Sequence, residues 1–410
     1  MRLTSVVVDK ISKTCNDQYM KLPKTGKPVD NEWTVLSCVV KYDRNSTNIE
    51  VVSLGTGSKC VGATKMSPRG DILNDSHAEV IARRGFLLYL YHEIEKSIGH
   101  KQSLFNQEDS KFKLKDGIEF IFYSSQLPCG DASIIPKDGE EDQFGDVLES
   151  LKRQADTEIC DSEPKVSKIK DIHRTGAKCL PGAKQDQREC GVNYHQVCQV
   201  RTKPGRGDRT LSVSCSDKLA RWVHVGIQGA LLNMFLDKPI YISSFIFGAG
   251  VPYSEETLER ALVKRNVIDY QLDSNRPDFY QSSVKYPHIR SEERIRPAAG
   301  SIVWINSNNV ISEVAVHGRK LGVTKKKLNS LSSALSISKF KLFHKFQHVM
   351  AKFEHKNVIL QDKDAENITY GEMKKMSVEY LKKWYDVRDK FFKIWTVKPD
   401  MWNFTIKNDS

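Results

Sequence analysis

The sequence has 410 residues, which is long for one domain, and 39% of them are hydrophobic, enough for a sizeable core and too many for wholesale disorder. With 63 basic against 51 acidic residues, the net charge of +12 favours a polyanionic partner such as nucleic acid. The nine cysteines do not form a secreted disulfide framework, the N-terminus lacks a signal-peptide core, and no run approaches the roughly 18 apolar residues of a membrane span. We therefore expect an intracellular protein of the cytoplasm or nucleus, with no membrane partner.

Strand-like and helix-like segments alternate along the chain. Short runs rich in β-branched residues predict strands, and apolar residues at helical spacing predict helices. The expected strands are residues 33–40, 48–54, 118–124 and 240–247, and the expected helices are residues 76–98 and 216–236. Helices interleaved with strands indicate an α/β fold with a layered core.

Three further regions are polar or basic. Residues 136–210 hold many charged, glycine and proline residues, which predicts a long surface insertion, a usual place for substrate contacts. Residues 271–300 are expected to form a second polar loop region. From residue 318 onward the chain is basic and expected to be helical, and lysine runs such as residues 325–327 are more typical of a solvated helix face than of a binding site.

Three short motifs carry side chains that bind metals. They are NDSHAE at residues 74–79, LPCGD at 127–131 and SCSDK at 214–218. His77, Cys129 and Cys215 supply three zinc ligands, which leaves the fourth tetrahedral position for water and so indicates a catalytic site. Two of the motifs lie at expected helix starts, where unpaired N–H groups and the helix dipole favour a thiolate.

Glu79 follows the histidine by two residues. A carboxylate at this spacing can take a proton from a zinc-bound water and deliver it to the substrate, as described for zinc deaminases with a His-x-Glu signature. The chain departs from that signature because Ala132 stands where a second cysteine would follow Cys129, so Cys215 is our candidate for that ligand. The structural alternative is a capping box formed by Ser76 and Glu79, which is the more common role of such a pair in isolation.

Four more cysteines fall in the insertion, namely Cys160, Cys179, Cys190 and Cys198. They form a loose cluster that could bind a second metal. Unpaired loop cysteines are the more common account of such spacing.

The three motifs extend into longer strings, in the order NDSHAEVIARR at residues 74–84, PCGDA at 128–132 and SCSDKLARW at 214–222. In these strings the chain resembles the adenosine deaminases that act on RNA, and the likeness runs from about Ile11 to Asn403. The resemblance implies a single deaminase domain over residues 1–410. It implies a cytidine-deaminase-like core, a central sheet with helices on both faces, and a large, mainly helical C-terminal extension. The implied chemistry is zinc-dependent hydrolytic deamination of adenosine to inosine.

Further strings are similar to the eukaryotic members of this family that act on tRNA, namely LPKTGKP at residues 22–28, EWTVLSCVV at 32–40, RTGAKCLPG at 174–182 and RTKPGRGDRT at 201–210. This likeness implies a tRNA partner, with inosine formed at position 37, next to the anticodon of alanine tRNA. Lys59 matches a family position near the target nucleotide. Arg174, Lys178 and Arg206 in the insertion are our candidates for phosphate contacts.

The resemblance also implies a buried inositol hexakisphosphate. The matching positions are Asn74, Arg83, Arg84, Lys218, Arg221, Trp222, Gln228, Tyr370, Lys374, Tyr380, Trp395 and Lys398. Asp75 and Lys203 match a polar relay between this ligand and the zinc site. Basic residues within apolar segments agree with the implication, because buried cations need a dense anion. The match is incomplete: Ala230 replaces a serine, Asn403 replaces an aspartate, and Trp384 stands where the mRNA-editing members have a lysine.

Two alternatives remain open. One is deamination of adenosine in double-stranded RNA, although Ser133 replaces an arginine that the mRNA-editing members place near the substrate. The other, of a different class, is a catalytically silent RNA-binding protein with a structural zinc. Glu79 argues against that second alternative, because a structural site has no use for a carboxylate at the water.

Overall fold

The computed structural model describes residues 2–137, 171–205, 208–265, 267, 276–328, 330–356, 360, 367–396 and 403–406. The middle of the expected insertion, residues 138–170, lies outside this described part. So do three of the residues singled out from the sequence, Cys160, Arg206 and Lys398.

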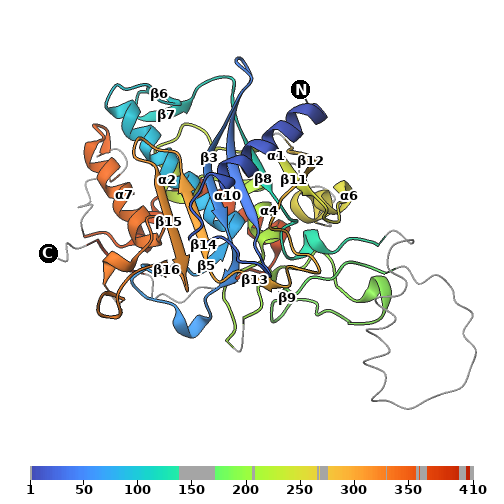
Figure 1. The fold of residues 1–410 in the computed structure, drawn as a ribbon. Helices are drawn as coiled ribbons and strands as arrows, with labels where there is room; N and C mark the ends of the chain where they lie inside the picture. Colours follow the sequence, from blue (N-terminus) through green and yellow to red (C-terminus); the bar gives the residue numbers. More distant parts are fainter. Residues whose placement is uncertain are drawn as a thin grey trace, which may run out of the picture.

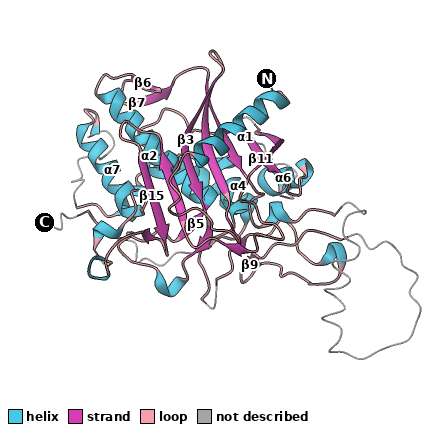
Figure 2. Ribbon diagram, in the orientation of Figure 1, coloured by secondary structure: helices cyan, strands magenta, loops and turns pink. Residues whose placement is uncertain are grey.

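Eight of the described strands form one mixed sheet at the centre of the molecule (Figure 2). In order across the sheet they are β12 (Asp278–Lys285), β11 (Ile242–Ala249), β8 (Ile118–Ser124), β2 (Leu36–Asp43), β3 (Asn48–Thr56), β14 (Ser301–Ile305), β15 (Ile311–Val316) and β16 (Arg319–Lys320). The strands β8, β11 and β12 run parallel, and the other neighbours in this sheet are antiparallel. The four strands expected from the sequence are confirmed, with boundaries shifted by a few residues.

Side chains of the central strands alternate between two apolar cores. On β2, Cys38 and Val40 pack with α1 (Ser5–Met20), whereas Val39 between them packs with α2 (Ala78–Ile98). The two helices therefore cover opposite faces of the sheet (Figure 1). Because a strand points successive side chains to opposite faces, every second residue enters each core. This arrangement confirms the predicted α/β class.

The single helix expected over residues 216–236 is wrong, since two helices occupy this range. The first, α4 (Cys215–Val225), ends at Gly226, whose φ of 92° lies in the left-handed region, and α5 (Gly229–Asn233) follows. A β-carbon at Gly226 would lie 2.2 Å from the side-chain oxygen of Gln228. Only glycine tolerates both the backbone conformation and this close approach, so the helix stops there.

Two other expectations need correction. Residues 271–300 are not only loop, because β12 forms an edge strand there that buries Phe279 and Ser282 and exposes Gln281, Ser283 and Lys285. After residue 318 the chain first forms β16, and α-helix begins only with α7 (Lys339–Lys352). Further along the described part of the chain lie the helices α9 (Tyr370–Lys375) and α10 (Val378–Val387), so the C-terminal extension is mainly helical, as predicted.

The remaining described strands form two-stranded pairs around the central sheet. They are β1 (Glu32–Trp33) with β13 (Arg296–Pro297), β4 (Ser58–Cys60) with β5 (Asp75–His77), β6 (Phe105–Glu108) with β7 (Lys111–Leu114), and β9 (Lys178–Cys179) with β10 (Arg201–Thr202). One short helix, α6 (Glu255–Glu259), continues into the π-helical turn η4 (Arg260–Lys264). Within the described ranges, none of the helices combines the length and apolarity that a membrane crossing requires.

Candidate active site

The three sequence motifs meet where β8 ends and where α2 and α4 begin. The strand β5 runs directly into α2 with His77 at the junction, Cys129 lies in the loop after β8, and Cys215 is the first residue of α4. The backbone N–H of Cys215 donates to Cys129 Sγ at 3.4 Å, and that of Ser216 donates to the Cys129 carbonyl at 3.0 Å. The loop after β8 is thus attached to the start of α4, which places the two thiols side by side.

The paired thiols lie beside a buried ammonium group. Lys203 Nζ is 3.1 Å from Cys215 Sγ, and its side chain is almost fully enclosed. The hydrogen bond with Cys215, together with the charge of Lys203, lowers the pKa of Cys129 to about 6. Burial instead raises the pKa of Cys215. A thiolate at Cys129 is the form that binds a metal.

Asp75 holds His77 and connects it to Lys203. Nδ1 of His77 lies 2.9 Å from an Asp75 carboxylate oxygen, and Lys203 Nζ contacts the two Asp75 oxygens at 2.9 and 3.1 Å. Lys218 forms a further ion pair with Asp75. The two lysines hold the pKa of Asp75 well below its usual range, even though burial acts to raise it.

Cys60 is a neighbour of His77 that the motifs did not indicate. Its Sγ lies 3.6 Å from His77 Nδ1, because β4 pairs with β5. Within the described residues, Cys60, Asp75 and His77 form a set of potential metal ligands whose atoms lie within 4.8 Å of one another. Cys129 and Cys215 are not part of that set. Since the Asp75 oxygens already accept from two lysines and His77, Asp75 is better placed to orient the imidazole than to bind a metal.

Glu79 lies in the first turn of α2 and is only 3% exposed. Its Oε2 has no hydrogen-bond partner among the described residues. The residue at the N-cap is His77, and no side chain caps the helix, so the capping box of Ser76 and Glu79 is absent. The charge of Glu79 acts to raise the pKa of both Cys129 and Cys215. A buried carboxylate oxygen without a partner among the described residues, whose charge acts on two neighbouring thiols, is an arrangement suited to catalysis.

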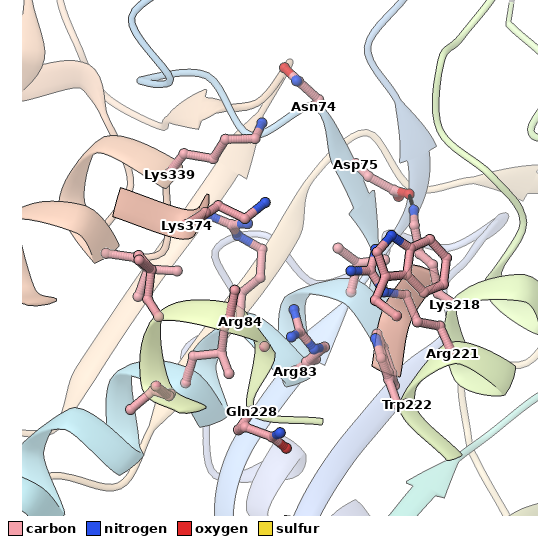
Figure 3. Close-up of a pocket in the computed structure, with 18 of the residues that line it drawn as sticks. Asn74, Asp75, Arg83, Arg84, Lys218, Arg221, Trp222, Gln228, Lys339 and Lys374 are labelled. Carbon is pink, nitrogen blue, oxygen red and sulfur yellow. Dashed lines mark hydrogen bonds and ion pairs between the residues drawn. The ribbon is translucent and has the colours of Figure 1, made fainter. Parts of the chain in front are cut away.

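Next to this candidate metal site, a cavity of about 480 Å³ lies between α2, α4 and the C-terminal helices. The residues expected to bind inositol hexakisphosphate line it together: Asn74, Arg83, Arg84, Lys218, Arg221, Trp222, Gln228, Tyr370, Lys374, Tyr380 and Trp395. Figure 3 shows basic side chains of α2 and α4 turned toward this common space. Lys339, at the start of α7, also lines the cavity and was not foreseen from the sequence.

The cavity gathers buried positive charge. Burial lowers the pKa of Arg83 to about 10 and also lowers the pKa of Arg84. Arg84 Nη2 and Asn74 Oδ1 are buried and have no hydrogen-bond partner in the described part of the chain. Arg221 stacks on the Trp384 ring at 3.7 Å, so the residue that replaces the editing-enzyme lysine supports a cation there. Asp75 is the carboxylate that lines this cavity, and cations outnumber it.

Gln228 lines the cavity in a structural role. Its side-chain oxygen accepts from Ile240 N–H at 3.0 Å, and its nitrogen donates to Asn233 at 3.0 Å and to the Val225 carbonyl. These bonds fix the turn between α4 and α5, where the pattern of apolar residues predicted continuous helix.

The candidate RNA contacts lie on β4 and in the insertion. Lys59, on β4, is exposed next to Cys60, and Lys178 is exposed on β9. The Arg174 side chain is 43% exposed and lies 4.2 Å above the Tyr194 ring. Ser133, where the mRNA-editing members have an arginine, donates to the Pro128 carbonyl at 2.8 Å. Of these positions, Ser133 is bonded to the loop that carries Cys129, and Arg174 precedes Thr175, which accepts from Gly130 of that loop.

The insertion cysteines do not gather into a metal site in the described part of the chain. Cys179 is buried and lies 3.6 Å from an Asp186 oxygen, Cys190 is exposed, and Cys198 donates its backbone N–H to Asp131. None of the described cysteines forms a disulfide bond.

Comparisons with known proteins agree with this arrangement. The family model of the adenosine-deaminase (editase) domain matches residues 53–399. A tRNA-specific adenosine deaminase 1 of Drosophila melanogaster is 38% identical over 96% of this chain and 95% of its own length. The Homo sapiens protein of the same name is 34% identical over 95% of this chain and 98% of its own length. A double-stranded RNA-specific editase of Drosophila melanogaster is 28% identical over 75% of this chain but only 42% of its own length. The chain is therefore an adenosine deaminase and belongs to the adenosine-deaminase (editase) family.

Proposed function

We propose that this enzyme deaminates adenosine in tRNA, at position 37 next to the anticodon of alanine tRNA, with zinc as its metal. The observation that carries the proposal is the buried Glu79 carboxylate, whose Oε2 has no partner among the described residues and whose charge acts on the paired thiols. Support for tRNA comes from the relatives that match along nearly their whole length, whose names are those of tRNA-specific deaminases.

The donor set fits zinc. His77, Cys129 and Cys215 are an imidazole and two thiols, the ligand types and the number that catalytic zinc sites use. When bound there, zinc supplies a Lewis acid that makes water acidic near neutral pH. Lys203 stabilises negative charge on Cys215, and Asp75 fixes the orientation of the His77 ring.

Glu79 moves the proton. Its free Oε2 can accept a hydrogen bond from the attacking water, hold the proton and pass it first to the adenine ring and then to the leaving ammonia. Its burial keeps solvent from exchanging with that proton, so one carboxylate serves both transfers. This role explains why the protein leaves the oxygen without a partner.

The cationic cavity fits inositol hexakisphosphate, which we propose as a structural ligand. Arg83 and Arg84 reach the space from α2 and Lys374 from α9, and Arg84 Nη2 has no hydrogen-bond acceptor among the described residues. Phosphate oxygens meet such groups with charge-assisted hydrogen bonds. The relay of Lys218, Asp75 and Lys203 then connects this ligand's cavity to Cys215.

The RNA is proposed to lie across β4 and the insertion, over Lys59, Arg174 and Lys178. An anticodon-loop adenosine is already unpaired, so its extrusion costs less than flipping a base from a duplex. Phosphate contacts by such lysines and arginines weaken as salt rises.

The test compares RNA substrates. The purified enzyme is incubated with folded alanine tRNA and, separately, with long duplex RNA, and new inosines are mapped by sequencing. We expect inosine at one adenosine beside the anticodon and little in the duplex. Equal activity on both RNAs would favour the double-stranded editase function. No inosine in any RNA, from zinc-loaded protein, would favour a silent RNA-binding protein.

A further inference from the structure

The described part of the insertion is built onto the active-site loop. Thr175 Oγ1 accepts a hydrogen bond from the Gly130 N–H at 3.1 Å, directly after the candidate ligand Cys129. Asp131 accepts from Cys198 N–H at 2.7 Å. The segments around Thr175 and Cys198 are therefore attached to the loop that carries Cys129.

Two side chains of this region form a stacked pair. The Arg174 guanidinium lies 4.2 Å above the Tyr194 ring, and the Arg174 side chain remains 43% exposed. Its contact with Asp171, at 3.9 Å, is long for an ion pair. The guanidinium is thus stacked on the tyrosine while much of the side chain remains accessible to a ligand.

A buried network holds this pair in place. His195, next to Tyr194, accepts from the Thr175 N–H at 3.1 Å and lies 3.1 Å from Asp186. Asp186 in turn binds the fully buried Arg201 through two hydrogen bonds of 2.6 and 2.7 Å. Each member of the stacked pair is therefore bonded, through its chain neighbour, to the same rigid network. Such support is expected under a binding surface and is not needed for a solvated loop.

We propose that Arg174 and Tyr194 form a platform on which an unpaired base of the substrate RNA stacks, at a loop position other than the target adenosine. The inference rests on the proposed function and deepens it by naming a specificity-determining contact. Guanidinium planes and aromatic rings are the surfaces on which proteins stack unpaired RNA bases. An arginine already stacked on tyrosine pays less conformational entropy when the base arrives. The platform favours an RNA loop that has an unpaired base near the target adenosine, and a duplex has no such base.

The test separates stacking from charge. Arg174→Lys keeps the positive charge and loses the plane, Tyr194→Leu removes the ring beneath it, and Lys178→Ala is a control that removes a nearby charge. Each protein is measured with an anticodon stem-loop and with versions carrying one abasic nucleotide at a loop position other than the target. Readouts are the dissociation constant by fluorescence anisotropy, kcat/KM for inosine formation, and zinc content and the unfolding midpoint as checks of folding.

We expect Arg174→Lys and Tyr194→Leu to bind the intact loop about tenfold more weakly, with zinc content unchanged. For the wild type, one abasic position should weaken binding by a similar factor. For the two variants it should weaken binding little further, since the substitution and the missing base remove the same contact. Lys178→Ala should lose affinity equally for all loops. The proposal is overturned if Arg174→Lys binds as the wild type does, or if every abasic loop loses the same factor in both proteins. The dissociation constants can be measured without any deamination. A failure to deaminate tRNA would therefore count against the proposed function and not against the platform.

Discussion

At the residue scale, the site depends on side chains whose ordinary partners are missing or shared. Glu79 keeps an unpartnered oxygen in a buried position, and Cys129 is held as the more acidic of two thiols. Asp75 accepts from His77 and two lysines at once. Such arrangements lower the stability of the folded protein, and they serve metal binding and proton transfer at the site.

Glu79→Gln should keep the fold and the metal but lose deamination by a factor of about 100 or more. Glutamine preserves the size of the side chain and cannot carry a proton. The measurement is inosine formation together with zinc content, with the exposed Glu256→Gln on α6 as the matched control. Activity near wild type would show that Glu79 has no part in proton transfer.

The identity of the metal ligands is decided by a pair of cysteine variants. Cys215→Ala should lose most of the bound zinc, because a thiolate ligand is removed, whereas Cys60→Ser should retain it. Metal analysis of the two proteins distinguishes the proposed ligand set from the one built on Cys60, Asp75 and His77. Retention by Cys215→Ala and loss by Cys60→Ser would reverse the assignment.

At the scale of elements, the turn between α4 and α5 positions both sites. It ends the helix that begins at Cys215, and its Gln228 lines the cationic cavity. Ala230 and Leu231, which follow the turn on α5, line the same cavity.

Gly226→Ala should destabilise the protein by about 1–3 kcal/mol, because alanine is strained at this positive φ and its β-carbon would meet the Gln228 side chain at 2.2 Å. Gly322→Ala is the control, since its φ of 86° is similar but no atom lies within 4 Å of the added carbon. The midpoint of thermal unfolding should fall further for Gly226→Ala than for Gly322→Ala. Equal shifts would show that backbone strain alone explains the effect.

A buried histidine on α4 makes folding sensitive to acid. Burial, with a contribution from Arg265, lowers the pKa of His224 from 6.5 to about 3. Below pH 6.5 the unfolded chain therefore takes up a proton that the folded protein refuses, and stability falls as the pH drops from 6.5 toward 3. His224→Leu should be less sensitive to pH over the range 6.5 to 4.5 in denaturant unfolding. An unchanged slope would assign the acid sensitivity to other groups.

At the scale of the whole molecule, the cationic cavity joins segments that are far apart in the chain. Arg83 comes from α2, Arg221 from α4, and Lys374 from α9. Because these charges repel one another in a buried space, we expect an anion in the cavity to favour the packing of the C-terminal extension on the core.

Protein denatured after purification should release inositol hexakisphosphate in about equimolar amount, measured by chromatography of the small molecules. Arg84→Met should lower both the recovered ligand and the unfolding midpoint, because a ligand that binds only the folded state stabilises it. Lys101→Met, an exposed position beyond α2, should change neither. Active, folded enzyme from cells unable to make the ligand would contradict the assignment.

The sequence by itself determined what repeats locally or depends on residue type. Short apolar runs rich in β-branched residues predicted the strands β3 and β8, helical spacing predicted α2, and the ligand types in three motifs indicated a metal site with Glu79 beside it. These features depend on neighbours along the chain, which a sequence displays directly.

Only the tertiary structure decided what depends on contacts across the chain. The helix ends at Gly226, because the Gln228 side chain folds back against this residue. Residues 278–285 form an edge strand, because α1 packs against one side of them. The tertiary structure brought Cys60 to His77 through the pairing of β4 with β5, and it placed the Arg174–Tyr194 stack beside the Cys129 loop. Periodicity carries no signal for such contacts, since they join residues whose separation in sequence is arbitrary.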